Sequence, residues 1–274
     1  MLQTCAMDMS RQGVNALSYF LRQAILQEQE TTRIARVGYA LLLAGCSTRG
    51  TFPSSEVASF ILSTQQEDGG WADVEETLWC LGYLAAYNNK YGRQISHGIE
   101  WLKSIQLPCG GWGKSERDQP RIPITALAAV LVPEIVSGAG LRWLAQQWES
   151  DLESPTQLTY KGAFFLLAHR HNQASYDTNL KNRTIDYLIG EQEEDGGFGP
   201  WKGHPVGSDP WSTGIVLWGL SRVGELMPRY TVKRALLWLE SSQLSNGLWP
   251  YHYLDDGAAM ALIGVSGVLP FLSE

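Results

Sequence analysis

The sequence has few charged residues, no surplus of basic ones and no long apolar run. Charged residues make up 18% of the 274 residues, and the formal net charge is −7. A chain this acidic lacks the basic surface with which proteins hold nucleic acids, so we expect no nucleic-acid partner. The scarcity of charge, together with 11 Trp and 11 Tyr, also argues against disorder, which needs high charge and few aromatic residues.

Signals for export and for membrane insertion are missing as well. The segment from Met1 to Ser10 has neither the basic nor the apolar region of a signal peptide. No apolar run reaches the roughly 18 residues that a membrane span needs. We therefore expect a cytoplasmic protein without a membrane span.

The cysteines form no recognisable motif. None of the four belongs to a C-x-x-C pair, so neither a zinc ribbon nor a redox pair is expected. Free cysteines of this kind usually behave as small apolar residues. They are Cys5, Cys46, Cys80 and Cys109.

What the sequence does contain is an internal repeat, whose recognition decides the fold. Each copy has an aromatic–aliphatic pair, then Gln, then a Gly-rich turn that ends in an aromatic residue. The clear copies are Phe60-Ile61, Gln65, Gly69-Gly70-Trp71; Trp101-Leu102, Gln106, Gly110-Gly111-Trp112; Tyr187-Leu188, Gln192, Gly196-Gly197-Phe198; and Trp238-Leu239, Gln243, Gly247-Leu248-Trp249. Degenerate copies begin at Phe20 and Trp143, so six periods of 40 to 51 residues fill the chain.

Each period holds two helical patterns. One precedes the Gln and is amphipathic, as in residues 92–106 and 230–243. The other follows the turn and is apolar nearly all round, which is typical of a buried helix. These apolar patterns cover residues 33–44, 75–87, 122–132, 160–169, 211–222 and 257–269. Six outer and six inner helices predict an all-α protein, an α6/α6 toroid of residues 13–274 after an N-terminal tail of residues 1–12. An open superhelix is the alternative.

The residue types of the turn have a physical explanation. A glycine can adopt positive φ and so end the outer helix. The Gln side chain can bond backbone groups that are freed there, and the aromatic ring can pack on the next repeat. We interpret the four motifs as structural staples.

The Gln–Gly–aromatic repeats resemble the QW motifs of squalene–hopene cyclases and related terpene cyclases, and the internal repeats of protein prenyltransferase β-subunits. The likeness runs from about Phe20 to Leu269. It implies an α/α toroid whose central apolar cavity, walled by aromatic residues, binds an isoprenoid. An apolar small molecule is thus the expected ligand.

The resemblance also implies catalytic residues. Class II cyclases protonate an alkene with a D-x-D-D motif that often continues Thr-Ala-Met-Ala. Asp255 and Asp256, followed by Gly257, are similar to its end, with Tyr253 in place of the first Asp. Prenyltransferases hold zinc with Asp, Cys and His; Asp209 matches the Asp, while Trp211 stands where the Cys should be.

Acidic residues gather where the inner helices are expected to begin, at one mouth of the toroid. Asp73 and Asp209 are interpreted first as helix caps. Asp255 and Asp256 exceed what one cap requires, so with Glu76 they are the candidate acids and bases, or ligands that hold Mg²⁺ against a diphosphate. Candidate cavity-lining residues are Tyr39, Trp79, Tyr83, Phe164, Trp211, Trp218 and the loop residue His252, for which core packing is the alternative.

Three functions stay open. The first is an isoprenoid-binding or cyclase-like protein with Asp255 and Asp256 as acids. The second is a catalytically silent toroid that binds a protein partner as a scaffold, which the incomplete acid and zinc motifs favour. The third is a carbohydrate-active α/α barrel that uses Glu76 and Asp256 as its carboxylate pair.

Overall fold

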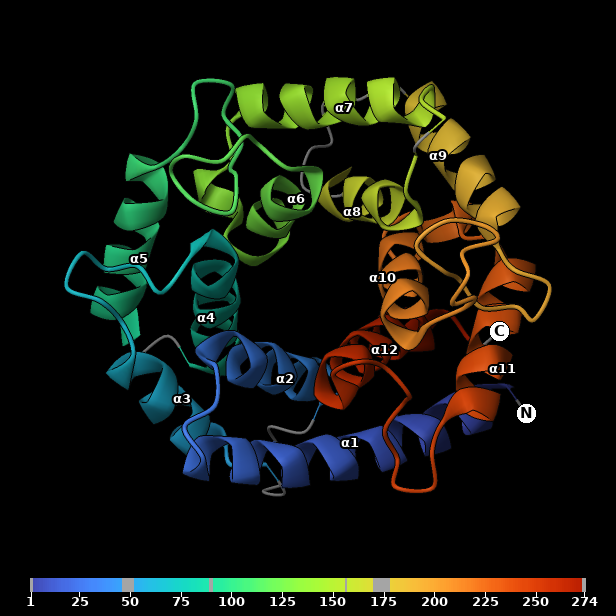
Figure 1. Cartoon of the computed structure of the whole chain (residues 1–274), viewed down its shortest axis with the longest axis horizontal. Helices are drawn as coiled ribbons and strands as arrows, with labels where there is room; N and C mark the ends of the chain where they lie inside the picture. Colours follow the sequence, from blue (N-terminus) through green and yellow to red (C-terminus); the bar gives the residue numbers. More distant parts are fainter. Residues whose placement is uncertain (1, 46–51, 89–90, 156, 170–177, 273–274) are drawn as a thin grey trace. The chain divides into compact units, whose positions relative to one another are not determined.

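The computed structural model describes residues 2–45, 52–88, 91–155, 157–169 and 178–272. Over these residues all regular secondary structure is helical, with twelve α-helices and short 3₁₀ segments (Figure 1). Residue contacts divide the chain into two compact units. Unit 1 comprises Met1–Leu17 and Trp148–Glu274, and unit 2 comprises Ser18–Gln147.

Unit 2 is built from three apolar helices with amphipathic helices on their outer sides. The apolar helix α4 packs between α2 and α6, while α3 covers α2 and α4, and α5 covers α4. This alternation follows the two sequence patterns, because a helix that is apolar all round needs neighbours on several sides. The bounds are α2 Thr31–Leu43, α3 Ser54–Ser63, α4 Val74–Tyr87, α5 Gly92–Ser104, α6 Ile122–Leu131 and η3 Pro133–Ile135; α1 (Leu2–Leu26) and α7 (Gly138–Leu152) run across the unit boundary.

Unit 1 repeats this plan. Helix α10 packs most extensively against α12 and also against α8, while α9 contacts α8 and α11 contacts α10. The α10–α12 contact is close because glycines lie in it: a Cβ on Gly214 would collide with the carbonyl of Met260. The bounds are α8 Thr159–His169, α9 Thr178–Glu191, α10 Pro210–Leu220, η4 Gly224–Leu226, α11 Arg229–Ser242, α12 Leu254–Val268 and η5 Leu269–Phe271.

The predicted inner helices are all present. The starts of α12 and of α1 differ from the prediction. Helix α12 begins at Leu254 rather than near Gly257, so Asp255 and Asp256 lie in its first turn. Helix α1 begins at Leu2, so residues 2–12, which the sequence analysis treats as a tail, are helical.

The Gln of each clear repeat is a bridge between two elements. Its Nε2 donates to the carbonyl of the turn glycine; for Gln192 the acceptor is Gly196 at 2.8 Å. In Gln65, Gln192 and Gln243 the same nitrogen also donates to the next outer helix, and Gln192 reaches the carbonyl of Thr231 in α11 at 2.9 Å. Gly196 has φ of +97°, a conformation that glycine adopts without strain. The predicted staple is confirmed, and it also joins successive repeats.

The last repeat uses the same bridge to hold the start of the chain. Gln243 donates to the carbonyl of Gly247 at 2.9 Å and to that of Met9 at 3.1 Å. A Cβ on Gly247 would lie 2.6 Å from the carbonyl oxygen of Gln12, which shows how closely α1 approaches this turn. The first residues of α1 therefore occupy the position of the next outer helix in unit 1.

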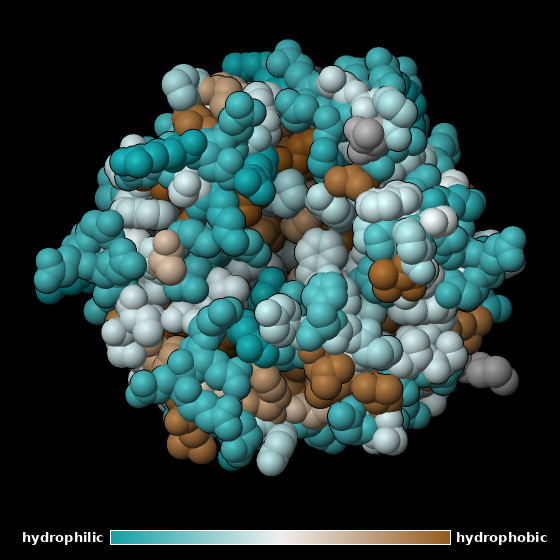
Figure 2. Space-filling model, viewed as in Figure 1, coloured by the Kyte–Doolittle hydropathy of each residue, from teal (hydrophilic) through white to brown (hydrophobic). Residues whose placement is uncertain are grey.

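The hydropathy of the surface differs from that of the core, as the amphipathic and apolar helix patterns predict. Figure 2 shows hydrophilic residues over most of one face, with apolar ones scattered among them. One described stretch, Leu254–Phe271, is long and apolar enough to cross a membrane, which corrects the expectation that no run reaches that length. This stretch is 61% buried, and α12 within it packs on α10. A buried core helix can be as long and as apolar as a membrane span, and these contacts are those of a core helix.

We expect Gln192→Leu to lower the free energy of unfolding by about 2–4 kcal/mol, because two enclosed carbonyl groups lose their donor. Gln192 is itself only 7% exposed. Urea denaturation followed by circular dichroism measures the change. The control Gln119→Leu, at an exposed position, should stay within about 0.5 kcal/mol of the parent. An equally small effect of Gln192→Leu would contradict the bridging role.

Candidate functional site

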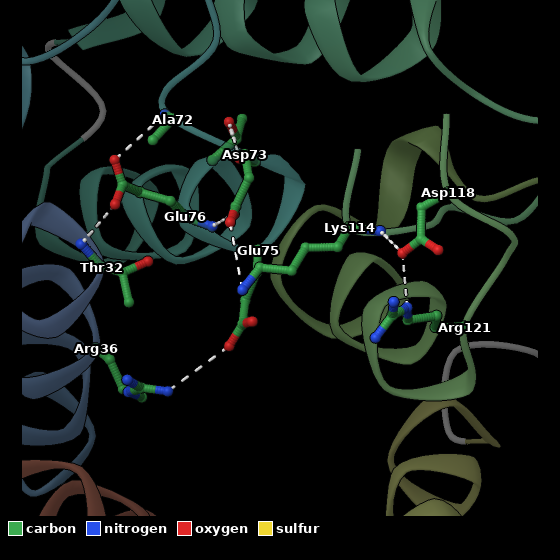
Figure 3. A network of polar contacts seen from close by, with 10 residues as sticks. Thr32, Arg36, Ala72, Asp73, Glu75, Glu76, Lys114, Asp118 and Arg121 are labelled. Atoms are coloured by element: carbon green, nitrogen blue, oxygen red, sulfur yellow. Dashed lines mark hydrogen bonds and ion pairs between the residues drawn. The ribbon is translucent and has the colours of Figure 1, made fainter. Parts of the chain in front are cut away.

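A network of polar contacts in unit 2 surrounds the start of α4, where the chain reads Asp73-Val74-Glu75-Glu76-Thr77 (Figure 3). Asp73 is the N-cap: its Oδ1 accepts a hydrogen bond from the backbone N–H of Glu76 at 2.9 Å. The Thr77 hydroxyl donates to the carbonyl of Asp73 at 2.8 Å and accepts from the N–H of Trp71 at 3.0 Å. The predicted capping role of Asp73 is confirmed, and the turn is locked onto the helix.

Glu76, a predicted catalytic residue, has both carboxylate oxygens bound to the backbone. Oε2 accepts from the N–H of Thr32 in the first turn of α2 at 3.1 Å, and Oε1 accepts from the N–H of Ala72 at 3.3 Å. Figure 3 shows the side chain lying between these two segments. This geometry gives Glu76 a structural role, because it satisfies donors at a helix start that have no partner within the helix.

Glu75 points to a different environment. One of its carboxylate oxygens lies 3.7 Å from the guanidinium of Arg36, whose side chain is only 10% exposed. The Arg36 guanidinium also lies 5.9 Å from the ring centroid of Trp79. Trp79 in turn packs edge-on against Tyr39, with centroids 5.7 Å apart. An acidic group, a cation and two predicted cavity-lining aromatic residues are thus neighbours in unit 2.

The loop before α6 supports this helix start. The backbone N–H of Val74 donates to the carbonyl of Lys114 at 3.1 Å, and the Lys114 ammonium lies 3.6 Å from Asp73. Asp118 holds the loop from the other side, since it accepts from the N–H of Lys114 at 3.0 Å and pairs with Arg121 at 2.7 Å. Its hydrogen bond with Arg121 lowers the pKa of Asp118.

Tyr83, a predicted cavity-lining residue, is buried and contacts both α2 and α3. Its hydroxyl donates to the carbonyl of Ser54 in α3 at 2.8 Å, and its ring contacts Gly38 in α2. Burial among these helices raises the pKa of Tyr83. The small size of Gly38 leaves room for its ring, since a Cβ there would lie 2.8 Å from a ring carbon of Tyr83.

In unit 1, Asp209 caps α10 as predicted. Its Oδ1 accepts from the N–H of Ser212 and its Oδ2 from the Ser212 hydroxyl, both at 2.7 Å. Burial raises the pKa of Asp209, although these hydrogen bonds oppose the shift. Among the described residues, no group of three or more His, Cys, Asp or Glu side chains could hold a metal ion. The geometry of Asp209 is that of a cap.

The paired acids Asp255 and Asp256 lie in the first turn of α12 in unit 1. Asp255 is 2% exposed and Asp256 is half-buried. Carboxylates there are favoured by the positive end of the helix dipole. Residue contacts assign Asp255 and Asp256 to unit 1, whereas Glu76 belongs to unit 2.

The remaining predicted aromatic residues of unit 1 differ in exposure. Phe164 and Trp218 are buried, at 3% and 2% exposed, whereas Trp211 is half-buried. Trp211 contacts Tyr160 edge-on with centroids 5.9 Å apart, so Tyr160 joins a group that the sequence analysis did not include. His252 is exposed, and its ring lies against that of Tyr251 at 3.9 Å rather than within the core.

The sequence analysis missed the α4 segment as the match to the acid motif. Asp73, Glu75 and Glu76 carry carboxylates at the three acidic positions of D-x-D-D, with Glu in two of them, and Thr77 follows as in the family pattern. The signal was available, because acid spacing and the following Thr fit better here than at Asp255 and Asp256.

Comparisons with known proteins bear on the family and the fold of this chain. The family model described as the squalene-hopene cyclase C-terminal domain matches residues 88–256, more than half of the chain. No curated protein matches the sequence.

Solved structures match almost the whole chain. A variant of the type II terpene cyclase MstE from Scytonema, in complex with the substrate geranylgeranyl dihydroxybenzoate, has a TM-score of 0.78 at 15% identity, over 97% of this chain and 99% of that one. Another MstE variant, in complex with the product merosterolic acid A, has a TM-score of 0.77 at 15% identity and the same coverage. A protein from Actinoplanes has a TM-score of 0.71 at 16% identity, over 96% and 99% of the chains. The predicted fold class, an all-α toroid of paired helices, is confirmed.

The raised pKa of Asp209 predicts a specific pH dependence of stability. The folded protein retains this proton above the unfolded pKa of about 3.9, so the free energy of unfolding falls as pH rises from there through the folded pKa. Asn can still cap the helix but does not titrate. We expect the stability of the parent relative to Asp209→Asn to be highest near pH 3.5 and to decline as pH increases. Urea titrations at a series of pH values test this. The exposed Glu100→Gln serves as control, and a relative stability that climbs with pH would contradict the prediction.

Proposed function

Because this chain belongs to the family of the squalene-hopene cyclase C-terminal domain, we propose that it binds an isoprenoid and cyclises it, with Glu75 as the acid that starts the reaction. The observation that carries this proposal is that the three acids of one segment have different partners. Asp73 and Glu76 both bind backbone N–H groups, and Glu75 makes no backbone hydrogen bond with its carboxylate among the described residues. It lies instead beside Arg36 and one helical turn before Trp79.

Acid-initiated cyclisation requires a proton donor and groups that stabilise a carbocation. A protonated Glu75 would transfer its proton to one carbon of an isoprenoid double bond, which forms a C–H bond and leaves a carbocation on the other carbon. A second double bond of the same chain then closes the ring by attack on that carbocation. The last carbocation loses a proton, so acid is regenerated overall. The faces of aromatic rings such as Trp79 and Tyr39 attract cations and can stabilise these intermediates.

Arg36 and the supporting loop fit the same role. A guanidinium beside the acid stabilises the carboxylate that remains after the proton has left, and its burial strengthens that interaction. The contacts of Lys114 with Asp73 and Val74 fix the start of α4, so the acid is held in one position.

The relatives support the ligand class. MstE structures contain a geranylgeranyl-bearing substrate in one case and a cyclase product in another. An apolar chain of this kind is therefore the first ligand to test for this protein. Asp255 and Asp256 remain the competing candidates for the initiating acid, since the pair lies at the start of the buried helix α12.

We expect Glu75→Gln to reduce product formation by about 100-fold or more, because an amide cannot supply the proton. The parent and the variant would be incubated with squalene, geranylgeranyl diphosphate and a geranylgeranyl-substituted dihydroxybenzoate, and products would be identified by mass spectrometry. The matched control is Glu100→Gln on the exposed face of α5, which should retain full activity.

Two outcomes would contradict the proposal. Loss of product in Asp256→Asn but not in Glu75→Gln would move the initiating acid to α12. No cyclised product from any substrate, together with no isoprenoid binding by calorimetry, would favour a catalytically silent toroid with a protein partner. Circular dichroism of each variant separates loss of chemistry from loss of fold.

A further inference from the structure

A pocket lies in unit 1, and it is independent of the acidic segment and of the function proposed for that segment. Its volume is about 410 Å³, and it is lined by Pro155, Gln157, Leu158, Glu191, Trp201 and Lys202. These residues come from the segment before α8, the end of α9 and the loop before α10. The volume lies within the range of small-molecule sites.

The loop that carries Trp201 is held in place by hydrogen bonds on both sides. The carbonyl of Pro200 accepts from the N–H of Thr159 at 2.8 Å. The N–H of Lys202 donates to Glu191, and the N–H of Gly203 donates to Glu193, both at 2.7 Å. The pocket is thus formed before any ligand arrives, which lowers the entropic cost of binding.

Its lining combines one flat apolar surface with a buried acceptor. Trp201 is 43% exposed, and His204 contacts it edge-on with centroids 4.2 Å apart, which supports the indole. The Oε1 atom of Gln157 is buried, and no described residue donates a hydrogen bond to it. An unsatisfied buried acceptor is costly, so a donor from a ligand or from water is expected there.

The charges of the pocket favour neither a cationic nor an anionic ligand. The Lys202 ammonium donates to the carbonyl of Gly190 at the end of α9 at 2.6 Å, and the Glu191 carboxylate accepts from the Lys202 backbone. One positive and one negative group therefore line the pocket, each already bonded within the protein. A cation would meet Lys202 and an anion would meet Glu191 on entry.

From these features we propose that the pocket is a binding site for an uncharged ring compound that bears a hydroxyl group. The ring lies against the indole of Trp201, and the hydroxyl donates to Oε1 of Gln157. Phenols and cyclic alcohols share this chemistry, and the experiment distinguishes them.

The test uses ligand-observed saturation-transfer NMR on the full chain, with phenol, anisole and cyclohexanol as probes. Anisole keeps the aromatic ring but lacks the hydroxyl donor. We expect saturable binding of phenol, of cyclohexanol or of both, and anisole should bind about fivefold or more weakly than phenol. Gln157→Met should weaken the hydroxyl probes by a similar factor and leave anisole unchanged, whereas Trp201→Ala should weaken all ring probes.

Matched controls locate the binding. Gln119→Met and Tyr230→Ala change a glutamine and an aromatic residue at exposed positions outside the pocket, and both should bind like the parent. The proposal would be overturned if phenol and cyclohexanol bound to Gln157→Met as tightly as to the parent. The lack of any saturable binding would also overturn it and would leave water as the partner of Gln157. Neither result depends on whether Glu75 is catalytic.

Discussion

The repeat glutamine is the interaction on which the rest of this structure depends. The amide nitrogens of Gln65, Gln192 and Gln243 each join the carbonyl of a turn glycine to the following outer helix, as Gln65 does with Gly69 and Gln94. A turn held in this way fixes the residue at which the next buried helix begins. Because polar groups without partners are costly in a packed interior, one such side chain determines the path of the chain over several residues.

The chemistry of the candidate site follows from this constraint. Once the turn at Gly69–Trp71 is fixed, Asp73 caps α4 and Glu76 reaches the first turn of α2. Two of three adjacent acids are then bound by backbone N–H groups, and Glu75 is left beside Arg36 and Trp79. Residues of the same chemical type receive different roles because their partners differ. Function is thus a property of the site and not of the acidic composition.

The likeness to type II cyclases is one of fold, at 15% identity over nearly the full chain. Within this chain the repeat glycines and glutamines are recognisable, because the turn glycines adopt positive φ and the glutamine amides bond backbone carbonyls. The acids have more freedom, since Glu and Asp offer the same carboxyl group at different reach. A D-x-E-E segment can therefore present the same carboxyl groups as D-x-D-D.

The sequence alone determined the six periods, the all-helical fold, the buried helices to within a few residues and the capping roles of Asp73 and Asp209. These features rest on periodicity and on contacts between near neighbours, which a linear chain records directly. Only the tertiary structure decided that Glu75 pairs with Arg36, that Tyr83 turns toward α3 and that Gln157 and Trp201 line one pocket. A pattern shows which side of a helix is buried, but the partner across the interface comes from another helix tens of residues away, and packing alone selects it.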